Sequence, residues 1–394
     1  MCMANWSDLP YDTLQHLTSF LPIQDYLRFG AVCRNWRIVA KQKCHSPAQQ
    51  IPWLALGEME DTKKRKFYNL LEDRHYYLDV PELRGKAFCG SSYGWLFTLD
   101  RKLNFHLVNP LTKECYDLPP PPIPSDYSNR HEEIRRYFEA ESDDEDAHGH
   151  TRELFERLKR CMVPKAILDY DPSKRSDFTV VILEAQKGTP AFWKPGSNAW
   201  TAITGVPHLL DDITFFEGKF YAVRGRLDNN YLANNYSVIY TFDVGSNHEA
   251  TKVELEVLHA SDPNYVAGYR SNSFSYLVVF DNELLLVERI ISLDDITRDF
   301  FVHKLDLGGN NYSKCQDINK HTIFMGVSSS VVISPSQFFN CMKDAIYFTD
   351  NSYSYGALNL GFYDFKENKI TYYPRHVVYH HTLAAPIWFT PNPW

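Results

Sequence analysis

Apolar residues recur at helical spacing in the first 46 residues of the chain. Leu14, Leu17 and Leu21 follow one another at intervals of three or four residues, as on one face of an α-helix. Pro10 and Pro22 stand where a helix can begin, because the first turn of a helix does not use the N–H that proline lacks. This pattern predicts three short helices. A helical unit of this size has a small core and leaves apolar side chains for a partner to cover.

From residue 51 onward the pattern changes from helix to strand. Short runs rich in Val, Ile, Phe and Tyr alternate with clusters of Gly, Asn, Asp and Pro. Three runs of similar design, 218–223, 282–287 and 344–349, recur at intervals of about 60 residues, which indicates an internal repeat. Radially repeated four-stranded sheets form a β-propeller, so the sequence predicts a mainly β fold after the helices.

The two ends of the β region lack complementary parts of one repeat. Residues 51–57 and 75–80 form an incomplete unit at the front, and 385–389 form an unpaired strand at the end. Joining them completes one blade and closes the ring. The repeat predicts six blades and leaves five or seven open.

One segment interrupts the repeat. Five prolines within 119–124 lead into residues 132–146, which hold eight acidic residues and two arginines. Clustered prolines resist strand pairing, and a run of like charges favours solvent. We therefore expect an acidic insertion loop at 119–160.

The overall composition argues against several classes of protein. Hydrophobic residues make up 44% of the chain and aromatic residues 15%, which excludes a chain that is disordered throughout. A formal net charge of −8 argues against nucleic acid or an anionic membrane surface as a partner. The N-terminus has no apolar signal region and the chain no membrane-length apolar run, so we expect no membrane partner.

The cysteines and histidines give little evidence of a metal site. The eight cysteines include no C-x-x-C pair, and they are typical of reduced thiols in the cytosol or nucleus. The His148/His150 and His380/His381 pairs have no third ligand nearby in the sequence, so no metal is assigned. The basic run at 63–66 is either a nuclear import signal or a charged turn.

Motifs of enzyme chemistry are also missing from the sequence. It contains no phosphate-binding loop, dinucleotide fingerprint, H-E-x-x-H or G-x-S-x-G. We therefore expect no cofactor and no catalytic activity.

Two sets of motifs resemble a known family. Leu9-Pro10, residues 25–29 (DYLRF) and residues 32–37 (VCRNWR) are similar to an F-box. Downstream, residues 94–97 (GWLF), 109–112 (NPLT) and 191–196 (AFWKPG) resemble the C-terminal kelch-like propeller of many plant F-box proteins. The resemblance divides the chain into an F-box at 1–46 and a propeller at 51–394. Thr13 and Thr18 depart from it, since F-box helices commonly carry aliphatic residues there.

The resemblance implies a substrate receptor of an SCF-type E3 ubiquitin ligase, in the cytoplasm, the nucleus or both. The F-box would bind a Skp-type adaptor and, through it, a cullin, while the propeller would bind an unknown target protein. Eight apolar residues are the candidate adaptor contacts, with Trp36 as the expected anchor. They are Leu9, Pro10, Leu14, Leu17, Leu21, Leu27, Val32 and Trp36. Without the resemblance, the same residues could be the core of a helical cap on the propeller.

A loop between two predicted strands is the candidate target-binding segment. It carries Arg226, Asp228, Asn229 and Tyr231, a mixture of polar groups and an aromatic ring that suits recognition on a rigid scaffold. An ordinary hairpin loop is the alternative interpretation. For the whole chain, the alternative function is a propeller enzyme or carbohydrate-binding module whose helices merely cap the ring.

Overall fold

The fold was determined as a computed structural model of the 394-residue chain. The structure describes residues 6–18, 20–21, 23–41, 50–59, 61–100, 102–122, 165–183, 190–207, 210–225, 236–244, 255–258, 272–292, 296–308, 311–326, 329–334, 341–349, 360–374 and 386–392.

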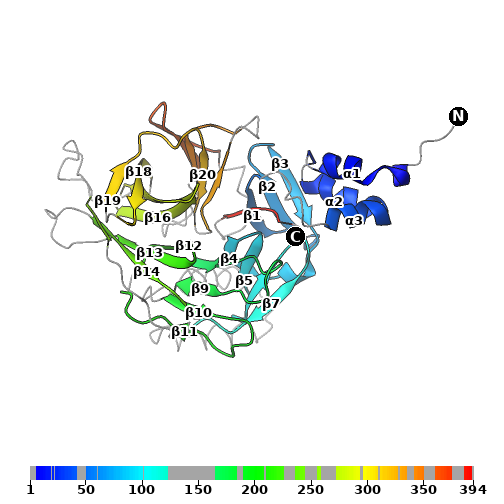
Figure 1. The fold of residues 1–394 in the computed structure, drawn as a ribbon, viewed down its shortest axis with the longest axis horizontal. Helices are drawn as coiled ribbons and strands as arrows, with labels where there is room; N and C mark the ends of the chain where they lie inside the picture. The colour runs from blue at the N-terminus through cyan, green and yellow to red at the C-terminus, as the bar shows by residue number, and fades with distance from the viewer. Residues whose placement is uncertain are drawn as a thin grey trace.

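Three short α-helices lie at the start of the chain, beside the ring of sheets (Figure 1). A 3-10 turn, η1 (Trp6–Asp8), precedes α1 (Tyr11–Thr18), α2 (Ile23–Val32) and α3 (Arg34–Lys41). Helix α1 starts directly after Pro10, and α2 starts directly after Pro22, as the sequence predicts. The prediction of three helices is therefore confirmed.

The described strands form six sheets around a common centre, which confirms a propeller of six blades (Figure 1). Blade 1 consists of β25 (Ile387–Phe389), β1 (Trp53–Glu58), β2 (Arg65–Asn69) and β3 (Arg74–Leu78), and a second 3-10 turn, η2 (Pro81–Leu83), follows it. Blade 2 consists of β4 (Ala87–Ser92), β5 (Trp95–Leu99), β6 (Phe105–Val108) and β7 (Cys115–Leu118). Blade 3 consists of β8 (Lys165–Leu168), β9 (Val180–Leu183), β10 (Pro190–Trp193) and β11 (Thr201–Ala202).

The other three blades follow in chain order, and the last of them, blade 6, has five strands instead of four. Blade 4 consists of β12 (Asp212–Phe216), β13 (Lys219–Gly225), β14 (Tyr236–Phe242) and β15 (Leu255–Leu258). Blade 5 consists of β16 (Asn272–Phe280), β17 (Glu283–Ile291), β18 (Thr297–Asp306) and β19 (Asn311–Lys314). Blade 6 consists of β20 (Thr322–Met325), β21 (Val331–Ile333), β22 (Ala345–Phe348), β23 (Gly361–Asp364) and β24 (Lys369–Tyr372), and β20 pairs with β22 in parallel.

The last strand closes the ring, as the sequence predicts. Strand β25 pairs antiparallel with β1, so that Trp53 lies opposite Phe389. Trp388, at the centre of β25, is buried and donates from its Nε1 to the carbonyl oxygen of Met325 in blade 6 at 2.9 Å. On the other side, Ser91 of blade 2 donates from its Oγ to the carbonyl oxygen of Trp388. One residue of blade 1 thus connects both neighbouring blades.

The residues after β25 extend this closure to blades 2 and 3. Asn392 donates from Nδ2 to the carbonyl oxygen of Tyr93 and to Asp171 Oδ2, each at 2.8 Å, and its own carbonyl oxygen accepts from Asn109 Nδ2 at 3.0 Å. Gly94 allows this close approach, because a Cβ there would lie 2.2 Å from the Cβ of Asn392. Its φ of +83° also requires glycine.

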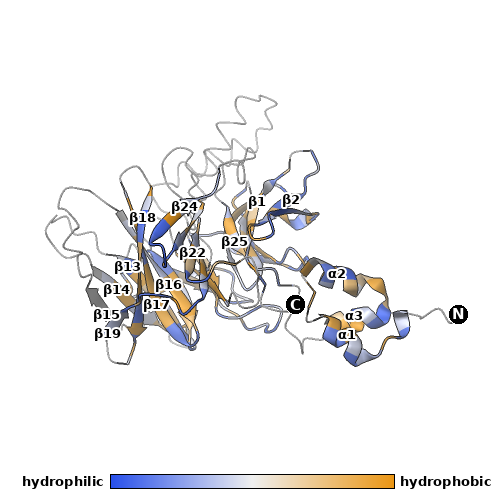
Figure 2. Cartoon of the chain, turned by 90° about the horizontal axis from the view of Figure 1, so that it is seen from above, coloured by the Kyte–Doolittle hydropathy of each residue, from blue (hydrophilic) through white to orange (hydrophobic). Residues whose placement is uncertain are grey.

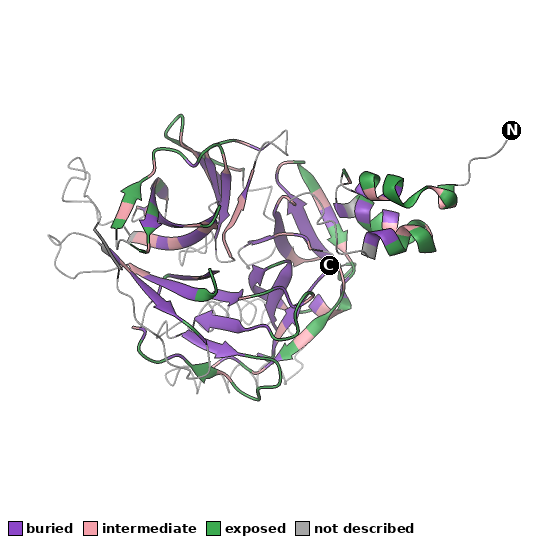
Figure 3. Ribbon diagram, in the orientation of Figure 1, coloured by how far each residue is buried: buried purple, intermediate pink, exposed green. Residues whose placement is uncertain are grey.

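Apolar clusters fill the spaces between neighbouring blades. The inner and middle strands are buried along most of their length, while β3, β7, β11, β19 and β24 at the outer edges are mostly exposed or half-buried (Figure 3). The largest cluster joins blades 2 and 3 through Trp95, Phe97 and Phe178. Trp95 Nε1 donates to Asp171 Oδ1 at 3.1 Å, so its polar atom is satisfied within the core. Such blade-to-blade packing makes the ring one continuous core.

The helices are attached to the ring through the start of α2. Ile23 is only 3% exposed and belongs to the apolar cluster of blade 1, together with Val80 and Leu83. This contact fixes the helical unit beside blade 1, where Figures 1 and 2 place it.

Strand β2 is the blade 1 strand that the sequence did not reveal. It includes half of the basic run at 63–66, which suggested a turn or an import signal. Arg65 and Lys66 are instead buried, and the Arg65 guanidinium donates to the carbonyl oxygens of Leu83 and Lys86 and pairs with Glu58. Arg65 and Lys66 therefore belong to a strand of the blade rather than to a turn.

Most of the predicted acidic insertion at 119–160 lies outside the described residues. The structure describes its first four residues. The carbonyl oxygen of Pro119 accepts from Trp200 Nε1 of blade 3 at 2.9 Å, and Pro121 is buried.

Candidate functional site

The helical unit has a small apolar core of its own. Leu14, Tyr26, Phe29, Val39 and Ala40 are buried in it, and Tyr26 Oη donates to the carbonyl oxygen of Ala40 at 2.6 Å. This burial raises the pKa of Tyr26 above its ordinary value. The core therefore holds α1, α2 and α3 together independently of the propeller.

The surface of the same unit is unusually apolar. Among the described residues, eleven large hydrophobic side chains are exposed, and seven of them lie in the first 41 residues. The four on the propeller are all tyrosines, whose hydroxyl groups suit a solvated surface. The seven, called here the F-box apolar surface, are Trp6, Tyr11, Leu17, Phe20, Leu27, Val32 and Ile38. Figure 2 shows hydrophobic stretches along α1, α2 and α3.

The structure divides the eight predicted adaptor contacts into three groups. Pro10, Leu17, Leu27 and Val32 are exposed. Leu9, Leu21 and Trp36 are half-buried against the helical core. Leu14 is a residue of the helical core with 2% of its surface exposed.

Trp36, the expected anchor, packs mainly within the helical unit. Its ring lies 4.4 Å from that of Phe29, and its Nε1 donates to the carbonyl oxygen of Trp6 at 3.1 Å. Trp36 therefore positions the N-terminal turn, while its remaining exposed edge adjoins the surface.

Four members of the F-box apolar surface were absent from the sequence prediction. They are Trp6, Tyr11, Phe20 and Ile38. None of them belongs to the set Leu14, Leu17 and Leu21 that defines the helical period, so the period assigned them no function. Of the two residues that depart from the family pattern, Thr13 is exposed, and Thr18 is buried and donates from Oγ1 to the carbonyl oxygen of Gln15 at 2.7 Å.

The two ends of the propeller differ in their connections. At one end, tight turns with positive φ at Tyr93-Gly94, Glu217-Gly218 and Asp281-Asn282 join the first two strands of blades 2, 4 and 5. Because successive strands run antiparallel, the next connection in each blade leaves at the opposite end. The long connections from β7 to β8, β13 to β14, β15 to β16 and β24 to β25 leave at that opposite end, called here the long-loop end.

Buried polar contacts join the blades near the long-loop end. Lys165 Nζ of blade 3 lies 2.7 Å from Asp212 Oδ1 of blade 4, and both side chains are almost fully buried. Ser237 and Ser275 join blades 4 and 5 through their Oγ atoms at 3.0 Å. Arg289 of blade 5 donates to the carbonyl oxygen of Thr349 in blade 6 at 3.3 Å. These contacts give the long loops a rigid base.

The predicted target-binding residues lie outside the described residues. Arg226, Asp228, Asn229 and Tyr231 belong to the connection between β13 and β14, which leaves at the long-loop end. The histidines at 148, 150, 380 and 381 also lie outside them. Within the described ranges, one group of metal-ligating side chains comes together, formed by His106, Cys115 and Asp117. No helix in the described part of the chain has the length and apolar character of a membrane span.

Comparison with known proteins agrees with this division of the chain. An F-box domain model matches residues 6–45, and a KIB1-4 β-propeller model matches residues 67–373. The expected kelch-like propeller is thus matched by the KIB1-4 type.

Curated relatives are F-box proteins of Arabidopsis thaliana. F-box protein SKIP23 is 22% identical over 428 residues, covering 100% of this chain and 96% of the relative. F-box protein At1g10110 is 30% identical over 187 residues, covering 45% of this chain and 41% of the relative. F-box/kelch-repeat protein At1g57790 is 23% identical and covers 82% of this chain and 77% of the relative.

Among solved structures, the β-propeller domain of the Trilobed protease from Pyrococcus furiosus is similar at 9% identity, with 82% of each chain covered and a TM-score of 0.34. That score carries no inference about function. Two domain models match the chain, and F-box protein SKIP23 is similar to it over its whole length. The chain therefore belongs to the family of F-box proteins with a KIB1-4 β-propeller.

Proposed function

We propose that this chain is the substrate-recognition subunit of an SCF-type E3 ubiquitin ligase. Its F-box would bind a Skp-type adaptor and, through it, a cullin, and its propeller would bind the target protein. The observation that carries the proposal is the F-box apolar surface, which holds seven of the eleven exposed large hydrophobic side chains of the described residues. Apolar surface gathered on one small unit is characteristic of a protein interface.

The proposed mechanism is proximity rather than bond making by this chain. A receptor that holds a target next to a ubiquitin-charged enzyme turns a dilute encounter into one at high effective concentration. A rigid scaffold suits this task because a flexible one would lower that concentration. The contact of Ile23 with blade 1 supports such rigidity between the two parts.

For target binding we propose the long-loop end of the propeller, including Arg226, Asp228, Asn229 and Tyr231. Recognition residues are commonly carried on loops above a rigid base, and the buried ion pair of Lys165 with Asp212 belongs to that base. We place this activity in the cytoplasm, the nucleus or both.

Calorimetric titration with a purified Skp-type adaptor tests the adaptor-binding part. Trp36→Ala is a poor probe, since Trp36 packs on Phe29 and its removal would disturb the fold. A Leu27→Ala/Val32→Ala variant removes exposed side chains only. Loss of an interface hot spot is worth about 2 kcal/mol or more, so we expect an affinity loss of about 30-fold or more.

A Tyr77→Ala variant is the matched control, because Tyr77 is an exposed aromatic residue on the edge strand of blade 1. It should bind the adaptor as tightly as the natural chain. Equal affinity of the Leu27→Ala/Val32→Ala variant and the control would contradict the proposed surface. If the natural chain does not bind the adaptor but binds glycans, the result would favour the alternative of a carbohydrate-binding propeller.

A further inference from the structure

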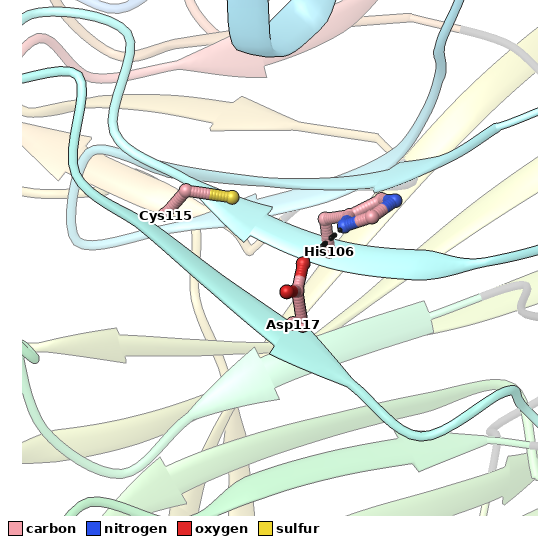
Figure 4. Close-up of side chains that lie close together, drawn as sticks. All are labelled: His106, Cys115 and Asp117. Carbon is pink, nitrogen blue, oxygen red and sulfur yellow. Dashed lines mark hydrogen bonds and ion pairs between the residues drawn. The ribbon is translucent and has the colours of Figure 1, made fainter.

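A hairpin at the outer edge of blade 2 brings three metal-ligating side chains to one face. His106 of β6 lies directly opposite Asp117 of β7 in the antiparallel register. Cys115 lies two residues before Asp117 and therefore projects from the same face of the strand. In Figure 4 the side chains of Cys115 and Asp117 point toward His106, and a dashed line joins His106 to Asp117.

The distances within this cluster suit a single metal ion. The possible ligand atoms of His106, Cys115 and Asp117 all lie within 4.8 Å of one another, and His106 Nδ1 lies 2.9 Å from Asp117 Oδ1. A tetrahedral zinc ion with bonds of about 2.0–2.3 Å holds its ligand atoms roughly 3.3–3.8 Å apart. Small rotations of the exposed Cys115 and Asp117 side chains would bring the three atoms to those separations.

A further carboxylate lies near the other ring nitrogen of His106. Asp100 Oδ2 is 3.6 Å from His106 Nε2, a buried atom that has no hydrogen-bond partner among the described residues. Asp100 is itself fixed, because its Oδ1 accepts from the backbone N–H groups of Lys102 and Asn104, each at 2.8 Å. Histidine ligands of zinc commonly donate their other ring N–H to such a carboxylate, and a shift of about 0.5 Å would form that hydrogen bond here.

The charges around the cluster favour a cation at its centre. Two carboxylates flank the His106 ring, with Asp117 Oδ1 2.9 Å from Nδ1 and Asp100 Oδ2 3.6 Å from Nε2. Their negative charges attract a cation to the cluster, and a bound divalent ion would neutralise them directly. The positive charge of Lys86 opposes this attraction.

We propose that His106, Cys115 and Asp117 form a zinc site, with water as the fourth ligand. The mixture of imidazole, thiolate and carboxylate suits Zn²⁺, which is borderline in softness, better than Mg²⁺ or Ca²⁺. The ion would tie β7, the outermost strand of blade 2, to β6. Asp100 is the positioning residue of the site.

Metal binding to the full-length chain, freed of any purification tag, tests the site. The natural chain and a His106→Ala/Cys115→Ser double variant are loaded with Zn²⁺. Both are dialysed against a chelator whose dissociation constant for zinc is about 1 μM, and the metal that stays bound to each protein is measured. We expect one more zinc ion per chain in the natural protein than in the variant. With Co²⁺ as a probe, the natural chain should give the visible bands of tetrahedral cobalt and a thiolate charge-transfer band that the variant lacks.

Two further variants distinguish specific zinc binding at this cluster from nonspecific zinc binding elsewhere on the chain. Cys315→Ser removes a partly exposed thiol of blade 5 that lies outside the cluster, and it should retain the extra zinc ion and the cobalt spectrum. Asp100→Asn keeps all three ligands and should weaken zinc binding about 10-fold, the usual effect of losing such a carboxylate. Equal zinc content in the natural chain and the double variant, or an unchanged cobalt spectrum in the double variant, would overturn the proposal.

Discussion

Replacement of Trp388 by alanine tests whether the last strand closes the ring. Trp388 is 1% exposed, packs edge-on against Phe324 of blade 6 with ring centroids 4.9 Å apart, and donates to the carbonyl oxygen of Met325. Truncating a buried tryptophan to alanine costs about 3–5 kcal/mol. The loss falls on the contact between blades 1 and 6, where the two ends of the propeller meet.

The corresponding shift in melting temperature follows from the size of the domain. An unfolding entropy of about 2.1 cal/mol/K per residue gives about 0.7 kcal/mol/K for a propeller of roughly 340 residues. A loss of about 3–5 kcal/mol therefore lowers the melting temperature by about 4–7 °C. Differential scanning calorimetry of the full chain measures this shift directly.

Tyr77→Ala is again the matched control, because it removes an exposed aromatic ring from the same blade. An exposed substitution changes stability by about 0.5 kcal/mol or less, which is under about 1 °C here. A chain that ends at Arg375 removes Ile387, Trp388 and Phe389 together and should lose about 5–9 kcal/mol, comparable to the whole stability of a domain. A Trp388→Ala variant that melts with the control would refute the argument that β25 holds the ring together.

Three other changes test separate parts of the fold. Gly94→Ala places a Cβ against Asn392 at a φ of +83° and should cost about 1–3 kcal/mol, and an unchanged denaturation midpoint would contradict that packing. Leu14→Ala should cost about 2–5 kcal/mol and abolish adaptor binding through loss of the helical core, with helical circular dichroism falling while the propeller transition stays. Replacing residues 123–160 with a short Gly/Ser linker should leave the melting temperature within about 2 °C, since closure cost depends only logarithmically on loop length; a much larger drop would show that the segment packs on the ring.

The sequence predicts the overall architecture well because the architecture depends on periodicity. Helical spacing up to residue 41 and repeated apolar runs afterwards are enough to predict three helices, a propeller and its closure by the last strand. Strand β2 escaped prediction because Arg65 and Lys66 look like surface residues. They are tolerated in the blade because the guanidinium of Arg65 is paired with carbonyl oxygens and Glu58, which no sequence pattern records.

The functional surfaces are less predictable, because they depend on which side of an element faces a neighbour. Leu14 and Leu17 look equivalent in the sequence, yet one is core and the other is exposed, since the position of α3 decides between them. The proposed zinc cluster was not predictable from the sequence for a similar reason. His106 and Cys115 have no recognisable ligand spacing, and only the register of β6 with β7 brings them together.

The pairing of β25 with β1 determines the order in which the chain can mature during its synthesis. Strand β1 leaves the ribosome early, but its inner neighbour is made more than 300 residues later, so blade 1 stays incomplete until β25 has been made. The helices contact one another over a span of about 30 residues and fold on local contacts alone. The proposed adaptor surface would thus form before the propeller is closed. A ribosome that stalls before β25 would release a chain with an open, aggregation-prone edge at β1.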